Sequence, residues 1–328
     1  MVDKLAADNN NIPVEYIFQI HESPCRAVLA ITGGGAEIIG ELLRHGNGSA
    51  TVLDAVVPYS TDALDRFLGR KPEKYCSEKT ARLMAMVAYQ RALDLSKGSG
   101  SADREVIGIG ATCKLKAANE REGRKHEIHV SIQTACETGM STLELAAERT
   151  REEEEKIAEF LIFNVLARHS NVPEIDLFDR IDTGDGLEEK VIEKYEFVSG
   201  SVGDLLKQKM CNQDSLYETL DMIRISLKEA KDPGEQGEPE ENGEPGKIRL
   251  VFPGSFDPCH RNHVFMAKLA FEKFGEPIHF EISLTNVDKP PIDIISLNQR
   301  LDSLRRYKDE NFMGSICLTN APLFLQKA

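Results

Sequence analysis

A tract of proline, glycine and glutamate constrains this chain more than any other feature. It runs from Asp232 to Gly246 and contains no apolar side chain. Such a segment cannot bury enough apolar surface to order itself, and its carboxylates repel one another. We therefore expect an extended acidic linker over residues 231–247, with a long domain before it and a short one after it.

The composition is that of a soluble globular protein with room for about two domains. The chain has 328 residues and a formal net charge of −14. An acidic field does not attract nucleic acid or anionic membrane surfaces, so we expect neither as a partner. No apolar run approaches the roughly 20 residues of a membrane span, and the N-terminus lacks the regions of a signal peptide. We expect a cytoplasmic protein, and homo-oligomerisation is left open.

The cysteines point to the same compartment. Their number is odd and no two of them form a CxxC pair, which is typical of reduced thiols rather than a disulfide framework. The positions are 25, 76, 113, 136, 211, 259 and 317.

Buried-strand runs alternate with helical periodicity in the N-terminal part, which predicts an α/β layered domain over residues 1–169. The expected strands are 26–32, 51–57, 106–110 and 127–133, and the expected helices are 36–44, 63–68, 77–93 and 144–168. Residues 170–230 contain amphipathic pieces and are expected to form a helical connector of unknown role.

The C-terminal part reads as the beginning of a parallel, Rossmann-like sheet. We expect strands at 248–252, 278–284 and 314–318, with helices at 263–274 and 297–307. Because the chain ends after the third strand, we expect an incomplete domain over residues 248–328.

The first turn of this part carries groups that suit a triphosphate. Gly254 allows close backbone approach, Ser255 adds a hydroxyl, and His260 and His263 lie in the first turn of the next helix. The N–H groups at a helix N-terminus attract anions. Donors aimed at the α-phosphate would stabilise the charge that builds there during nucleotidyl transfer.

The segment Gly254-Ser-Phe-Asp-Pro-Cys-His-Arg-Asn-His263 resembles the G-[ST]-F-[DN]-P and H/T-x-G-H signature of cytidylyltransferase-like nucleotidyltransferases. That family includes nicotinamide-mononucleotide adenylyltransferases. The stretch from Asn286 to Arg300 resembles its second conserved region, in which a lysine before proline reaches the phosphates. The resemblance implies that the nucleotide is bound by Gly254, Ser255, Phe256, His260, His263 and Lys289.

The same resemblance implies a catalytic role for His260, His263 and Lys289, with ATP as the donor and Mg²⁺ bound with it. The acceptor would be a small phosphorylated molecule, and a pyridine mononucleotide is the best guess. Two features depart from the family. Asn262 replaces a glycine, and a later triphosphate-binding segment is absent. The alternative is a vestigial nucleotidyltransferase segment.

Three N-terminal segments resemble the nicotinamide-nucleotide amidase domain of the CinA proteins. They are Leu29-Ala-Ile-Thr-Gly-Gly34, the stretch from Val57 to Gly69, and the stretch from Val106 to Ala111. In those amidases a lysine activates a serine nucleophile, and both groups are needed. Their positions hold Ala30 and Leu64 here, so we expect no amidase activity. The alternative function is therefore an amidase-like ligand-binding or interaction protein, with Gly33 to Gly35 as a candidate phosphate loop.

Other polar groups receive a structural interpretation. His126 and His129 should point to opposite faces of one strand, so no metal site is predicted there. Cys76 has no histidine near it in sequence, and we expect a packed thiol. The glutamates from Glu152 to Glu155 are typical of a solvated helix face.

Overall fold

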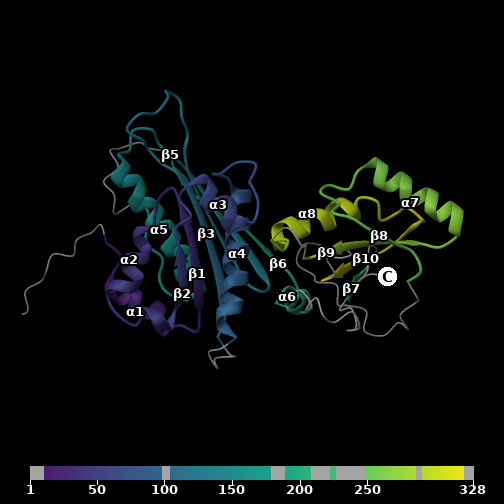
Figure 1. The fold of residues 1–328 in the computed structure, drawn as a ribbon, viewed down its shortest axis with the longest axis horizontal. Helices are drawn as coiled ribbons and strands as arrows, with labels where there is room; N and C mark the ends of the chain where they lie inside the picture. Colours follow the sequence, from purple (N-terminus) through teal and green to yellow (C-terminus); the bar gives the residue numbers. More distant parts are fainter. Residues whose placement is uncertain are drawn as a thin grey trace, which may run out of the picture. The chain divides into compact units, whose positions relative to one another are not determined.

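The computed structural model describes residues 11–97, 104–178, 189–207, 222–226, 248–285 and 290–320. The chain divides into two compact units, Met1–Tyr195 and Glu196–Ala328 (Figure 1). The division lies upstream of the acidic tract, which falls outside the described residues. The difference from the expected boundary arises because residues that precede the tract pack into the second unit.

The first unit is built on a six-stranded sheet in the order β2-β1-β3-β4-β5-β6. Strand β1 is parallel to β2 and β3, and β3, β4 and β5 are antiparallel to one another in turn. The strands are β1 (Arg26–Thr32), β2 (Val52–Val56), β3 (Val106–Lys114), β4 (His126–Gln133), β5 (Glu137–Leu145) and β6 (Ile192–Phe197).

Helices cover both faces of this sheet (Figure 1). Side chains of β1 alternate between the faces: Leu29 packs in the cluster that includes α1, α2 and α5, whereas Val28 packs with α3 and α4. The helices are α1 (Val14–Glu22), α2 (Glu37–Arg44), α3 (Thr61–Leu68), α4 (Glu78–Ser96) and α5 (Arg151–His169), with a short 3₁₀ turn, η1, at Gly48–Ala50.

The mixed α/β fold class is confirmed, but strand β5 was not expected. Residues 144 and 145 end this strand, and the charged helix begins later than expected. Its start is fixed by Thr150, whose hydroxyl accepts from Glu153 N–H while the Glu153 carboxylate accepts from Thr150 N–H. This reciprocal capping box satisfies two donors that a helix start leaves without partners.

The glutamate run of α5 is not a uniformly solvated face, so that expectation was wrong. Glu154 is fully buried and accepts from His126 Nδ1 at 2.5 Å and from the backbone N–H of Lys116. Glu155 accepts from the backbone N–H of Gly35 at 2.6 Å. These glutamates instead connect α5 to β4 and to the glycine turn at Gly33–Gly35.

The second unit contains a four-stranded sheet in the order β7-β10-β9-β8. Strands β8, β9 and β10 are parallel and β7 runs antiparallel to β10. The elements are α6 (Gly200–Lys207), β7 (Met222–Ile225), β8 (Val251–Pro253), α7 (Arg261–Phe274), β9 (Ile278–Ser283), α8 (Ile294–Arg305) and β10 (Met313–Thr319). The parallel strands with their two crossover helices follow the expected Rossmann-like start.

Residues 170–230 do not form a purely helical connector. They supply β6 to the first sheet, β7 to the second sheet, and α6, whose Leu205 and Leu206 join the core of the second unit. In the described parts of the chain, no helix is both long and apolar enough to cross a membrane.

Candidate functional site

The turn between β8 and α7 is held in one conformation by backbone contacts. Gly254 N–H donates to the carbonyl of Glu281 on β9 at 3.0 Å. A Cβ at residue 254 would lie 2.7 Å from the Phe256 ring, and Phe256 itself has a φ of +47°. Glycine therefore permits the backbone to pass directly over the aromatic ring.

The Phe256 ring belongs to the core of the second unit. It is 1% exposed, and its centroid lies 5.3 Å from that of Phe280 and 5.1 Å from that of His263. Among the residues expected to bind nucleotide, Phe256 can therefore offer a ligand only its backbone. Its ring instead packs edge to face against the His263 ring.

Ser303 of α8 anchors the turn, a role that the sequence did not suggest. Its hydroxyl accepts from Cys259 N–H at 2.9 Å, and its single proton faces two carbonyl oxygens, that of Arg300 in the same helix at 2.9 Å and that of Phe256 at 3.2 Å. Both ends of the turn are thereby fixed to one buried side chain. Ser255, between Gly254 and the anchored Phe256 carbonyl, is exposed.

His260 and His263 are brought together at the start of α7. The backbone N–H of His260 donates to His263 Nδ1 at 3.2 Å, and the two rings stack with centroids 3.8 Å apart. Burial, and then the charge of His260, lower the pKa of His263 below its ordinary value. Because Nδ1 accepts a hydrogen bond, the neutral ring carries its proton on Nε2, which is then a donor.

Arg300 adds a cation beside the same turn. One of its terminal nitrogens, Nη2, lies 3.3 Å from Asp257 Oδ2, and its side chain is only 15% exposed. Its Nε is buried without a hydrogen-bond partner among the described residues. Lys289, the remaining expected phosphate ligand, lies outside the described residues. The turn thus gathers Gly254, Ser255, both histidines and an arginine at one helix N-terminus.

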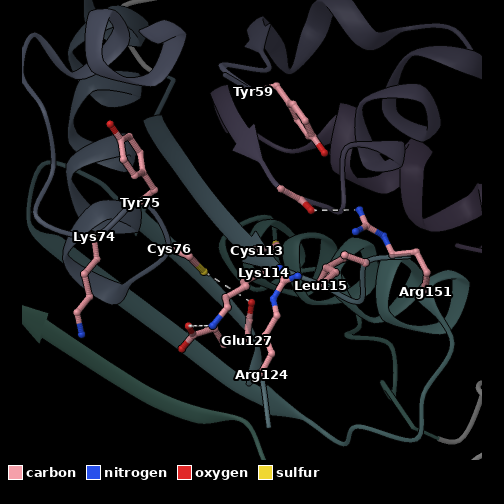
Figure 2. A pocket seen from close by; sticks show the side chains of 12 residues that line it. Tyr59, Lys74, Tyr75, Cys76, Cys113, Lys114, Leu115, Arg124, Glu127 and Arg151 are labelled. Carbon is pink, nitrogen blue, oxygen red and sulfur yellow. Dashed lines mark hydrogen bonds and ion pairs between the residues drawn. The ribbon is translucent and has the colours of Figure 1, made fainter. Parts of the chain in front are cut away.

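The first unit contains a separate cavity of about 750 Å³ (Figure 2). Most of the charged side chains that line it are basic, and Glu127 is the one acidic side chain among the described residues of the lining. The lining includes Lys74, Lys114, Arg124 and Arg151, together with Gly33, Tyr59, Tyr75, Cys76, Cys113, Leu115 and Ala117. An excess of positive charge suits an anionic ligand.

The glycine turn at the edge of this cavity is occupied by the protein's own side chains. Gly35 N–H donates to Glu155, and Arg151 Nη2 donates to the Gly33 carbonyl at 3.3 Å. A Cβ at Gly33 would lie 1.9 Å from the Cys113 carbonyl oxygen. Close packing against β3 therefore accounts for Gly33, and the Gly35 donor already has a carboxylate partner.

The positions of the resembled amidase pair lie in an apolar core. Ala30 is fully buried and Leu64 is 2% exposed, and both pack in the cluster beneath α3 and α4. Neither side chain offers a nucleophile or a base.

The two strand histidines do face opposite sides of the sheet. His126 contacts Glu154 of α5, whereas His129 contacts Thr142 and Glu127 on the other face. Cys76 is part-buried directly before the N-cap of α4, as expected of a packed thiol, but folding also brings its sulfur close to the His129 ring, which lies far away in sequence. Residues far apart in sequence carry no periodic signal of this contact.

Comparisons with known proteins give two kinds of similarity. Residues 251–320 match the cytidylyltransferase-like family, which confirms the resemblance of the Gly254–His263 segment. Among solved structures, competence/damage inducible protein CihA from Agrobacterium tumefaciens is similar, at 17% identity and a TM-score of 0.37, over 52% of this chain and 99% of that one. A competence-damaged protein (CinA) superfamily protein from Escherichia coli has 15% identity and a TM-score of 0.33, over 52% and 96%. No curated protein matches the chain.

Proposed function

We propose that the second unit is an adenylyltransferase module that transfers AMP from Mg-ATP to a phosphate-bearing acceptor. The cytidylyltransferase-like match supports nucleotidyl transfer in general. The observation that carries the proposal is the stacked pair of His260 and His263 at the N-terminus of α7, directly after the glycine turn. Helix N–H groups and imidazole donors converge there on the place where an anion binds best.

The residues have separable roles in this proposal. His263 donates from Nε2 to the triphosphate, because its Nδ1 is held by His260 N–H. Ser255 and the backbone at Gly254 line the approach to the phosphates. Arg300 supplies a nearby positive charge, and Lys289 is proposed to reach the phosphates from the segment that follows β9.

The reaction needs no protein nucleophile. An oxygen of the acceptor's phosphate attacks the α-phosphorus of ATP, the bond from that phosphorus to the bridging oxygen breaks, and pyrophosphate leaves. The protein's contribution is orientation and stabilisation of the charge that develops. Mg²⁺ is usually held by substrate phosphates and one or two carboxylates. Asp257 is already paired with Arg300. The phosphates would therefore supply most of the ligands of Mg²⁺.

A pyridine mononucleotide is the proposed acceptor. The support is an analogy, since the segments around Thr32 and Tyr59 resemble domains that act on nicotinamide nucleotides. A second candidate function rests on the first unit, whose cavity is lined by four cations and one carboxylate. This charge balance favours binding of a phosphorylated ligand without turnover, because Ala30 and Leu64 are apolar.

The test is release of pyrophosphate by the full chain given Mg-ATP with nicotinamide or nicotinate mononucleotide. We expect release that depends on the acceptor, and a loss of about 10²–10³-fold in His263→Ala, as for removal of one donor to developing charge. Lys268→Ala, on the exposed surface of α7, is the matched control and should retain the rate. A folded wild-type protein that releases no pyrophosphate with any phosphorylated acceptor would overturn the proposal and favour the ligand-binding alternative.

A further inference from the structure

We propose that Cys76, Glu127 and His129 form a zinc site at the wall of the cavity in the first unit. One ligand atom from each residue, a thiol sulfur, a carboxylate oxygen and an imidazole nitrogen, lies within 4.8 Å of the other two. Cys76 and Glu127 also line the cavity (Figure 2). The inference concerns a different unit from the proposed transferase and does not depend on it.

The fold explains why these three residues meet. Glu127 and His129 are two residues apart on β4, so their side chains share the sheet face that α4 covers. Cys76 lies just before Ser77, the N-cap of α4. Its sulfur approaches the carbonyl oxygen of Thr112 at 3.6 Å and that of Glu127 at 3.8 Å. The position of Cys76 at the start of α4 thus places its thiol close to Glu127 and His129 on β4.

The His129 ring is oriented as a ligand. Its Nδ1 lies 3.2 Å from the Thr142 hydroxyl, which donates its own proton to Glu78 at 3.3 Å. The hydroxyl oxygen therefore accepts from Nδ1–H, and Nε2 carries a lone pair. Metal-binding histidines are commonly fixed in this way, with the second ring nitrogen held by a hydrogen-bond partner.

The second ring nitrogen of His129, Nε2, accepts no hydrogen bond from the described residues. The residue is 6% exposed, and Nε2 is buried without a hydrogen-bond partner in the described part of the chain. It lies 3.4 Å from Glu127 Oε2. The lone pair of the buried Nε2 consequently faces the Glu127 carboxylate, whose side chain is 30% exposed at the cavity, and a cation between the two groups would bind both.

The donor set selects the metal. A thiolate, an imidazole and a carboxylate are typical zinc ligands, whereas Mg²⁺ and Ca²⁺ take oxygen ligands. Zinc bonds of about 2.0–2.3 Å in tetrahedral geometry place ligand atoms about 3.4–3.6 Å apart. The distance from His129 Nε2 to Glu127 Oε2 already has this value, at 3.4 Å. The ligand atoms lie within 4.8 Å of one another, so closure around zinc requires the Cys76 sulfur to approach the pair by at most about 1.2 Å.

Three protein ligands leave a fourth position open, as in catalytic zinc sites. Lys114 and Arg124 line the same cavity, and Lys114 Nζ lies 3.8 Å from Glu127 Oε1, a distance typical of a weak ion pair. An oxygen of an anionic ligand at the fourth position would therefore meet both the metal and these cations.

The test is metal binding by the full chain after removal of metal with a chelator. Zinc is titrated in competition with a chromophoric chelator, and Co²⁺ is added separately because a thiolate ligand gives Co²⁺ an intense charge-transfer absorption. We expect one high-affinity site per chain with the thiolate band. Cys76→Ser should abolish the band, and Thr142→Val should weaken zinc binding by about 10–100-fold, the effect of losing an outer hydrogen bond to a ligand.

Cys136→Ser and His45→Ala are matched controls outside the cluster and should bind zinc as the wild type does. Circular dichroism establishes that each variant is folded. Thr142→Val keeps all three ligands, so it tests the site even if a ligand variant does not fold. Wild-type zinc affinity in folded Cys76→Ser, or a Co²⁺ complex without the thiolate band, would overturn the proposal. Neither readout involves ATP or pyrophosphate, so failure here is distinct from failure of the transferase proposal.

Discussion

The backbone N–H of His260 donates to Nδ1 of His263 at 3.2 Å, and the two rings lie stacked 3.8 Å apart. This contact determines which nitrogen of His263 is protonated, and it places His260 where its charge opposes protonation of His263. The pair is therefore coupled both structurally and electrostatically.

This coupling predicts a shift in titration. The pKa of His263 is lowered first by burial and then by the charge of His260. His260→Ala removes the second cause, so the pKa of His263 should rise while remaining below its ordinary value. NMR titration of the imidazole Cε1–H signals measures it directly. An unchanged or lower pKa would contradict the proposed effect of the His260 charge on His263.

Ser303 and Ser255 should separate stability from activity. Ser303→Ala leaves the buried Cys259 N–H without its partner, which should cost about 1–3 kcal/mol of unfolding free energy. Ser255 is exposed, so Ser255→Ala should leave stability unchanged and weaken ATP binding. Urea unfolding and ATP titration of both variants test this contrast. Equal stability of the two variants would contradict the anchoring role of Ser303.

Two neighbouring glutamates of α5 should respond differently to removal. Glu154 is fully buried and holds His126 and the Lys116 N–H, so Glu154→Ala should destabilise the protein by about 3 kcal/mol. Glu152 is exposed at the helix start, and Glu152→Ala should cost less than about 1 kcal/mol. Thermal unfolding of both variants gives the comparison. Similar losses would mean that burial of Glu154 does not matter.

Much of the fold was predictable because it depends on local pattern. Apolar runs predicted β1 and β3. The glycine and histidines of the turn after β8 predicted the start of α7. Strand β5 was missed because its small polar residues, such as Thr138 and Ser141, resemble a loop until they are paired with β4. The acidic tract suggested a domain boundary that the division at Tyr195 and Glu196 does not follow.

Some of the site residues were likewise predictable from local sequence, and others depend on contacts between distant segments. His260 and His263 were predictable because a helix start brings residues three apart together. Ser303 and the group of Cys76 with His129 were not, since each depends on contacts between segments distant in sequence. Phe256 belongs to the recognisable turn, yet only the packing shows that its ring faces the core.

The central claim is that the start of α7 binds a triphosphate, and calorimetric titration of the full chain with Mg-ATP tests it most directly. We expect binding by the wild type and by Lys268→Ala, and loss of about 10-fold or more in affinity in His263→Ala, equivalent to removal of one charge-assisted hydrogen bond. Equal affinity in the wild type and folded His263→Ala would contradict the account.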